Sequence, residues 1–338
     1  MKPGHRFTGA LAAAVSLLAL AAAAQSAPAA HKVVAQIPGP DGGWDYASFD
    51  PVERRLYITR QTTVMVVDVD SGKVEAPFAS GKRLHAALRI PGAEEVALTD
   101  SGDQTVKFVG LHDGKLMASV STPPDTDGAV YDPGSGLLVV VCGDGGVVDL
   151  IDPKTHASVK EIKLDTPLEF ASTDGKGHIF VNESEKAAVA RLDMATGALT
   201  ATWSLPDCRG PTGLAAAEGL VISACASGRA IVLDGASGKV LGDYKVGGFP
   251  DSVIFDARRH LAYVPSAISG DMIVIPTSGP DRGKVTETVA THLGARTGAV
   301  DPKTGRVYLP AADYLPATAP GRRPQPKPGT FRIVVVGE

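Results

Sequence analysis

The chain has 338 residues and a formal net charge of −4, and 44% of its residues are hydrophobic, enough for a large core. Glycine (38) and proline (25) are abundant, while aromatic residues make up only 5%. This composition is typical of many short strands joined by tight turns. A mildly acidic chain with few aromatics argues against a protein that follows nucleic-acid phosphates, so we expect no nucleic-acid partner.

The first residues have the pattern of an export signal. Lys2, His5 and Arg6 form a short basic region, an Ala/Leu-rich run follows, and small residues at 24–27 offer a cleavage site. The apolar run is too short and too rich in Ala to anchor well across a hydrocarbon core of about 30 Å. We predict a signal peptide over residues 1–26, a periplasmic location and no membrane span after its removal. A retained anchor is the alternative.

Three cysteines, Cys142, Cys208 and Cys225, remain after that cleavage. In an oxidising compartment, one disulfide and one free thiol is the simplest account of three cysteines. No Cys-x-x-Cys spacing is present, so we do not expect metal binding by cysteine. The residues alone leave the pairing open at this point.

A repeating unit fills residues 31–338. Each copy has a first strand that usually ends in Asp, a second strand, a third that usually ends in Asp, and a polar turn into a fourth. Within these runs apolar and polar residues alternate, which indicates strands. The copies start 39 to 45 residues apart, at Asp45, His85, Asp127, Glu169, Thr212, Asp251 and Arg296. Four strands repeated seven times predict one all-β domain, a seven-bladed β-propeller, rather than an open β-solenoid or a two-sheet sandwich.

The two ends of the chain complement each other. The last copy lacks a fourth strand because the sequence ends at "FRIVVVGE" (331–338), whereas a spare strand, "HKVVAQI" (31–37), precedes the first copy. We therefore predict that the N-terminal strand completes the last blade and removes an exposed edge. A Pro-rich insertion at 311–330 interrupts this blade and is predicted either as an extended loop or as a lid over one face. We expect a monomer.

The first strand of each blade lines the channel of a propeller, so the seven starting residues should form a ring at its mouth. All seven are polar. Arg296 should pair with Asp251 or Asp45, and His85 should lie between Asp45 and Asp127. Two residues further along, the ring is mostly small and apolar and predicts a narrow throat, lined by Ala47, Ala87, Ala129, Ala171, Leu214, Val253 and Gly298.

We predict that this mouth binds a small polar molecule or an exported protein partner. Asp127 and Glu169 are adjacent acids without a basic neighbour in the predicted ring, so they must share a proton, take up a cation or point apart. Together with Asn182 they are candidate oxygen ligands of a divalent cation, and the sequence leaves the identity of any cofactor open. The predicted binding residues are Asp45, His85, Asp127, Glu169, Asn182, Asp251 and Arg296. The alternative is that the polar ring only keeps water in the channel.

A hydrolase with lactonase-like chemistry is the competing hypothesis. His85 or the Asp127/Glu169 pair would act as general base, and Arg296 would stabilise developing negative charge. The sequence has no nucleophile elbow, no His-Glu-x-x-His, no phosphate-binding loop and no EF-hand, and it leaves open whether the protein is an enzyme. A docking scaffold is a third hypothesis, and it predicts an exposed apolar patch instead of a pocket.

Several fragments resemble the exported YVTN-type (YncE-like) seven-bladed β-propeller family, and the resemblance covers residues 31–338. They include "GGWDYASFDPVERRLYI", "PLEFASTDGKGHIFVNE" and "GARTGAVDPKTGRVYLPAA". The resemblance implies a Cys208–Cys225 disulfide, with Cys142 free, across the first hairpin of blade five. The chain departs from the family pattern at Arg60 and Cys142, where the family usually has a His and an Asn. The resemblance implies a periplasmic propeller but no particular reaction.

Overall fold

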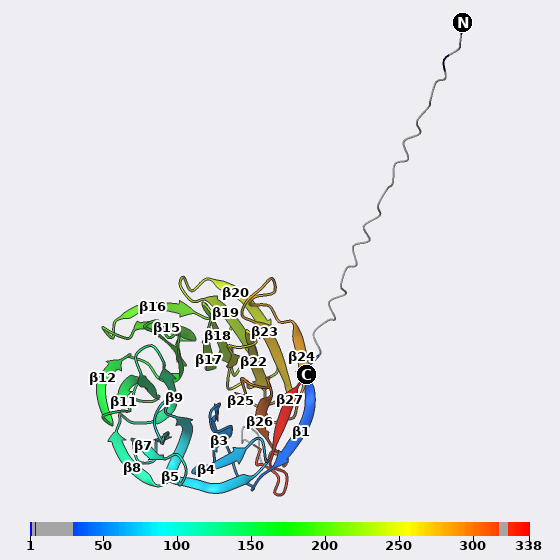
Figure 1. Cartoon of the computed structure of the whole chain (residues 1–338). Helices are drawn as coiled ribbons and strands as arrows, with labels where there is room; N and C mark the ends of the chain where they lie inside the picture. The colour runs from blue at the N-terminus through cyan, green and yellow to red at the C-terminus, as the bar shows by residue number, and fades with distance from the viewer. Residues whose placement is uncertain (2–3, 5–29, 318–323) are drawn as a thin grey trace.

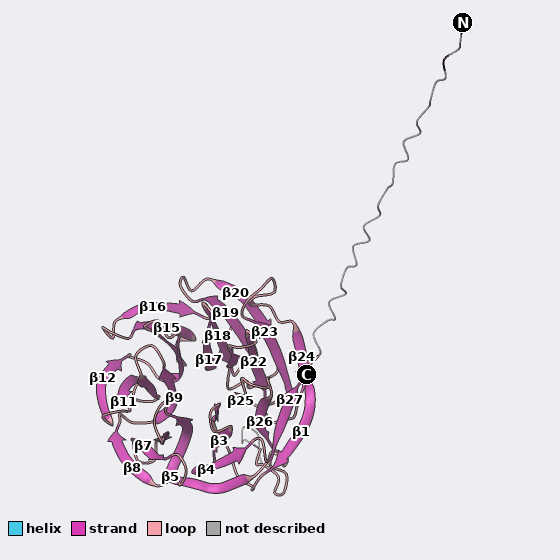
Figure 2. Ribbon diagram, in the orientation of Figure 1, coloured by secondary structure: helices cyan, strands magenta, loops and turns pink. Residues whose placement is uncertain are grey.

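The computed structural model describes residues 1, 4, 30–317 and 324–338. The predicted signal peptide at 1–26 therefore lies outside the described residues, apart from two single positions. The described residues form strands β1 to β27 and no helix (Figure 2). Within these ranges, no helix has the length and apolar character that crossing a membrane would need. The all-β class predicted from the alternating pattern is confirmed.

The strands form six antiparallel sheets that stand around a common centre (Figure 1). One sheet has seven strands, in the order β2 (Ala47–Asp50), β3 (Arg55–Thr59), β4 (Gln61–Asp68), β5 (Val74–Arg89), β6 (Glu95–Asp100), β7 (Thr105–Gly110) and β8 (Leu116–Ser121).

The other five sheets have four strands each. The first two contain β9 (Thr126–Asp132), β10 (Leu137–Cys142), β11 (Val147–Asp152) and β12 (Ala157–Lys163), then β13 (Leu168–Thr173), β14 (His178–Glu183), β15 (Ala188–Asp193) and β16 (Leu199–Ser204). The next two contain β17 (Pro211–Ala217), β18 (Leu220–Cys225), β19 (Arg229–Asp234) and β20 (Val240–Lys245), then β21 (Ile254–Asp256), β22 (Leu261–Ser266), β23 (Asp271–Pro276) and β24 (Glu287–Ala290). The last contains β25 (Ala299–Val300), β26 (Val307–Ala311), β27 (Arg332–Gly337) and β1 (Lys32–Pro38).

The last sheet joins the two ends of the described chain. Strand β1 pairs antiparallel with β27 from Lys32 opposite Gly337 to Pro38 opposite Arg332. This is the pairing that the missing fourth strand of the last copy predicts. Because β1 covers the outer side of β27, that strand has neighbours on both sides.

Strand β5 differs from the predicted pattern because it continues through what the repeat treats as two strands. Its first part pairs with β4 and its second part with β6, and Leu84 has a partner on each side. Gly81 lies at the changeover, where an added side chain would collide with Leu84 and with the carboxylate of Asp100. The continuous strand is the reason why one sheet contains seven strands.

The Asp residues that end the inner strands hold the hairpin turns and connect neighbouring sheets. Asp301 is fully buried and accepts a hydrogen bond from the backbone N–H of Lys303 at 2.8 Å. Arg54, from the hairpin after β2, donates to both oxygens of Asp301 at 3.1 and 2.9 Å. A similar ion pair joins the first and second copies of the repeat, where Nε of Arg89 lies 3.1 Å from Oδ2 of Asp50. The similar hairpins at 44–57 and 296–310 thus meet where the first and last sheets adjoin.

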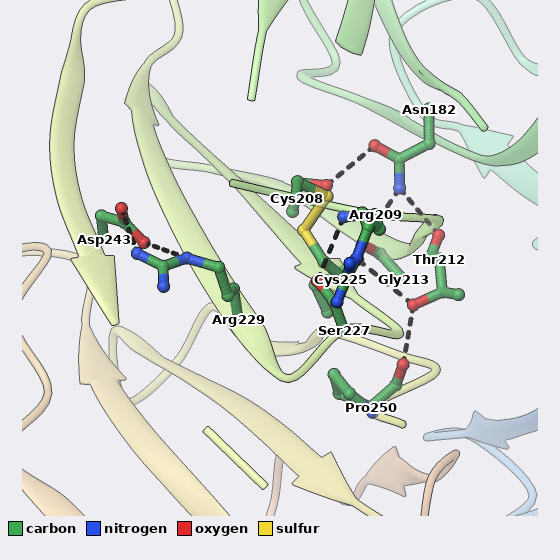
Figure 3. Close-up of a disulfide and its surroundings, with 12 residues drawn as sticks. Asn182, Cys208, Arg209, Thr212, Gly213, Cys225, Ser227, Arg229, Asp243 and Pro250 are labelled. Carbon is green, nitrogen blue, oxygen red and sulfur yellow. Dashed lines mark hydrogen bonds and ion pairs between the residues drawn. A yellow bond between two sulfur atoms is a disulfide. The ribbon is translucent and has the colours of Figure 1, made fainter. Parts of the chain in front are cut away.

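The disulfide joins Cys208 to Cys225, with Cα atoms 5.6 Å apart (Figure 3). It links the segment before β17 to the end of β18, across the hairpin that the resemblance implies. Cys142 is free and buried. Both parts of the cysteine prediction are confirmed.

Candidate functional site

Three of the predicted mouth residues meet at one point. The Nδ1 atom of His85 lies 2.7 Å from Oδ2 of Asp45 and 3.1 Å from Oδ1 of Asp127. Asp45 precedes β2, His85 lies in β5 and Asp127 lies in β9, so three consecutive inner strands each supply one side chain. The expectation that Asp127 has no basic neighbour is wrong, because His85 contacts it directly.

Backbone hydrogen bonds among the segments of β2, β3 and β5 fix these positions. The N–H of Tyr46 donates to the carbonyl of His85 at 3.2 Å, and the N–H of Asp45 donates to the carbonyl of Thr59 at 3.1 Å. The hydroxyl of Thr59 also donates to the carbonyl of His85, at 2.7 Å. The carboxylate and the imidazole are therefore held by main-chain contacts that do not involve their own polar atoms.

The other ring nitrogen of His85 also has a partner. Its Nε2 atom lies 2.9 Å from the Oγ atom of Ser101, in the turn after β6. Ser101 was not among the predicted site residues. The ring therefore has a polar contact on each nitrogen, and its orientation is fixed on both sides.

The surroundings shift the pKa values of both His85 and Asp127. Burial would lower the pKa of His85, but the hydrogen bond to Asp45 and the charges of both carboxylates outweigh it and raise the pKa. Burial raises the pKa of Asp127 well above its ordinary range. His85 opposes this second shift, while the charges of Asp45 and Glu169 add to it.

Arg296 occupies the other side of the mouth. Its Nε donates to Asp251 at 2.9 Å, and its Nη2 donates to the carbonyl of Trp44 at 2.8 Å. Its guanidinium carbon lies 5.6 Å from the centre of the Trp44 ring. Of the two acids that the sequence offers to Arg296, the structure pairs it with Asp251. This ion pair places the positive charge of Arg296 beside Asp251, on the side of the mouth away from the contact of His85 with Asp127.

Two aromatic residues that the sequence did not indicate lie across the channel. The rings of Tyr46 and Phe170, from the first and the fourth copies of the repeat, have centres 5.0 Å apart. Burial raises the pKa of Tyr46 well above its usual value, and the charges of four carboxylates add to it, those of Asp127, Asp251, Asp45 and Glu169. The Tyr46 ring therefore lies among all the acidic residues of the mouth.

The predicted narrow throat is wrong. Most of the small apolar residues expected there line a cavity of about 1110 Å³. This cavity also reaches hairpin residues such as Asp174 and Glu218, at the end of the inner strands opposite to the mouth. Small side chains at the wall leave space in the middle, and the contact of Tyr46 with Phe170 narrows the channel instead.

Asn182 has a structural position and is no cation ligand. The side chain is fully buried, its Nδ2 donates to the carbonyls of Thr212 and Gly213 at 2.7 and 3.2 Å, and its oxygen accepts from Ser223 at 2.9 Å (Figure 3). These bonds tie β14 to the neighbouring sheet. Thr212, another predicted mouth residue, donates to the carbonyl of Pro250 at 2.7 Å and is buried.

The described part of the insertion forms a short hairpin on the face where the mouth opens. Leu315 donates to the carbonyl of Gln325 at 2.9 Å, and the Tyr314 ring lies 6.4 Å from that of Trp44. Tyr314, Trp44 and Arg296 line a hollow of about 520 Å³ together with Leu293 and Ile268. The insertion thus borders the mouth, and the sequence could not indicate on which residues it packs.

The comparisons with solved structures agree with this arrangement. The chain is similar to U3-55K, with a TM-score of 0.75 and 10% identity over 90% of this chain and 98% of that one. It is also similar to a chain of Kuenenia stuttgartiensis hydrazine synthase, with a TM-score of 0.69 and 15% identity over 84% of this chain and 95% of that one. The chain has a β-propeller fold. At these identities the likeness concerns the fold alone.

Among curated proteins, the chain is similar to the U3 small nucleolar RNA-associated protein 21 homolog of Schizosaccharomyces pombe. The two are 28% identical over 152 residues, which is 42% of this chain and 16% of that protein. The match thus spans about a sixth of that protein. No protein-family model matches the chain.

Proposed function

We propose that the chain is an exported, periplasmic propeller of seven blades and of the YVTN type. Seven copies of the repeat support this count if the seven-stranded sheet is divided at β5, whose first part ends one blade and whose second part begins the next. The basic, apolar and small-residue pattern at 1–26 supports export. Sequencing the N-terminus of the protein recovered from the periplasm tests this proposal. A start near residue 27 is expected, and an intact N-terminus in the cytoplasmic fraction would contradict it.

The proposed function is binding of a small cationic ligand at the mouth. One observation carries it: the charges of four carboxylates, those of Asp127, Asp251, Asp45 and Glu169, act together on the hydroxyl group of Tyr46. Acidic groups gathered around one point attract positive charge. An exported protein that presents a basic side chain to the mouth is included in the proposal.

A thermal-unfolding screen with spermidine and choline tests this function. Stabilisation by such amines, lost in Glu169→Gln, is the expected result. A matched control is Glu94→Gln, since Glu94 is an exposed acid whose carboxylate lies 3.0 Å from His112. If the amines stabilise all three proteins equally, or none of them, the mouth is no binding site for organic cations.

A hydrolase is the second candidate, and one geometry favours it. Ser101 Oγ, His85 and Asp45 are in hydrogen-bond contact in the order of nucleophile, base and orienting carboxylate. However, two carboxylates face His85 and raise its pKa, which favours the protonated ring and weakens it as a base. A panel of lactones and esters, compared between the wild type and Ser101→Ala, decides the matter. Turnover that disappears in Ser101→Ala would establish the hydrolase.

A further inference from the structure

Nδ1 of His85 faces two carboxylate oxygens but can carry only one hydrogen. A neutral or protonated imidazole carries at most one hydrogen on Nδ1. Here that nitrogen faces two carboxylate oxygens, at 2.7 and 3.1 Å. One hydrogen can point well at only one of them, whereas a metal ion can contact both oxygens and the nitrogen together.

The three ligand atoms also have the spacing of a metal site. One atom each from Asp45, His85 and Asp127 lies within 4.8 Å of the other two. Zinc binds imidazole nitrogen at about 2.0–2.1 Å and carboxylate oxygen at about 2.0–2.2 Å, so neighbouring ligand atoms lie roughly 3 Å apart. The two distances from Nδ1 are close to this value. Only small side-chain shifts would admit an ion in place of the hydrogen.

Ser101 supplies a second, independent feature. A histidine that binds a metal through one nitrogen usually gives the hydrogen of its other nitrogen to a fixed acceptor, which sets the tautomer and the ring plane. Nε2 of His85 lies 2.9 Å from Ser101 Oγ, on the side of the ring away from the acids. When Nε2 donates to Ser101 Oγ and an ion replaces the hydrogen on Nδ1, the lone pair of Nδ1 faces the ion between the two carboxylates.

We propose that Asp45, His85 and Asp127 bind one divalent first-row transition-metal ion such as Zn²⁺, with His85 as the nitrogen ligand through Nδ1. This inference rests on the proposed cation-binding function of the mouth and names one cation. An imidazole with two carboxylates suits zinc or manganese, whereas calcium and magnesium prefer oxygen ligands alone. The three side chains are partly exposed, at 28%, 12% and 18%, so an ion can enter from the mouth and keep water or a ligand as a further partner.

The test measures Zn²⁺ binding to chelator-treated mature protein by equilibrium dialysis with elemental analysis. One ion per chain is expected for the wild type. We expect at least 100-fold weaker binding in His85→Gln and Asp127→Asn, and about 10-fold weaker binding in Ser101→Ala. Calcium at the same concentration should not compete.

His178→Gln is the matched control. Its Nδ1 lies 2.7 Å from Asp174, the same distance as in the His85–Asp45 pair, but with a single carboxylate. This variant should bind Zn²⁺ like the wild type. Far-ultraviolet circular dichroism and thermal unfolding of every variant show whether it is folded, and Asp127→Asn, which keeps the size of the side chain, retains the test if His85→Gln does not fold.

Three outcomes overturn the inference: no Zn²⁺ on the wild type, equal binding by His85→Gln and the wild type, or preference for calcium. These results are separate from the test of the proposed function. A protein that binds spermidine but no Zn²⁺ keeps the cation-binding mouth and excludes the metal site. A protein that binds Zn²⁺ and no amine supports the metal site and limits the mouth to metal ions.

Discussion

Strand β9 has an aspartate near each end, Asp127 and Asp132, and the two ends of the inner strands use this residue differently. At the mouth, Asp127 faces His85 but lies near other acids, and its pKa is raised. At the hairpin end, Asp132 is buried and accepts the backbone N–H of Ser135 at 2.7 Å. The equivalent Asp301 has Arg54 as partner, and its pKa is lowered, because these bonds outweigh burial. An aspartate thus stabilises the fold at the hairpin end, whereas its ionised form is disfavoured at the mouth.

The repeat explains this difference. Every copy needs a hairpin turn, so the aspartate that accepts the N–H groups of the turn recurs, as in Asp50, Asp132, Asp256 and Asp301. The mouth residues change from copy to copy, because no local backbone contact requires a given side chain there. Variation inside a repeat therefore marks the positions that are available for binding.

The largest effect should come from removing the strand that joins the two ends of the chain. Deleting residues 31–38 removes β1 and exposes the outer edge of β27. We expect the melting temperature to fall by about 10 °C or more, because contacts such as the ion pair of Arg54 with Asp301 are then left to hold the first and last sheets together. Calorimetry of the truncated protein measures this, and a change of only a degree or two would mean that Arg54 and Asp301 suffice.

The next prediction compares the loss of stability when Arg54 loses its buried partner, Asp301, or its exposed partner, Asp70. Asp301→Asn should destabilise the protein by about 3 kcal/mol near neutral pH, because it leaves Arg54 without its buried partner. Asp70 binds the same Arg54 at 2.7 Å but is 61% exposed, so Asp70→Asn should cause no measurable change. Urea unfolding of both variants tests the comparison.

The pH dependence of Asp301 has a definite sign. Its pKa is lowered in the folded state, so its contribution is present above the unfolded pKa of about 3.9 and is lost as the pH falls through the folded value. The deficit of Asp301→Asn should therefore shrink below about pH 4. A deficit that stays constant into this acid range would contradict the ion-pair explanation.

For Asp127, at the mouth, the expected pH dependence of stability has the opposite sign. The pKa of Asp127 is raised, so wild-type stability falls as the pH rises from the unfolded pKa of about 3.9 through the folded value. Asp127→Asn lacks this penalty. Its stability relative to the wild type should improve with rising pH, by on the order of 1 kcal/mol. Glu169→Gln should act in the same direction, since the charge of Glu169 raises the pKa of Asp127.

Unfolding midpoints of these two variants at pH 4 and pH 8 test this reversal. A loss of stability that grows with pH would show that these acids stabilise the fold as those of the hairpin end do. The dialysis experiment on Asp127→Asn then reports its effect on binding separately from its effect on the fold.

The smallest effect is expected for Tyr46→Phe. This change keeps the ring contact with Phe170 and removes only the hydroxyl group that lies among the acids. Stability should stay within about 0.5 kcal/mol of the wild type, since no core volume is lost. A loss above about 2 kcal/mol in urea unfolding would show that the hydroxyl group, and not the ring, maintains the centre of the mouth.

Repeat spacing predicted the contact of His85 with Asp45 and Asp127, because equal positions in adjacent copies must be neighbours. The same reasoning missed Tyr46. Strict alternation turns it away from the channel, but β2 begins only at Ala47, so Tyr46 precedes the regular strand. Asn182 was misplaced for another reason: its partners are main-chain carbonyls of the next sheet, and carbonyls leave no mark in a sequence.

The pairing of β1 with β27 also has a consequence for how the protein is made. Residues near Lys32 are synthesised about 300 residues before their partners near Gly337. Closing so long a loop is slow and costs chain entropy, so the interior sheets can assemble well before the last one. During that interval β1 and its partner edge are both unpaired, which is the condition under which strands of different molecules join. Aggregation during synthesis should therefore depend on when residues 332–337 can pair with β1, more than on the stability of the folded protein.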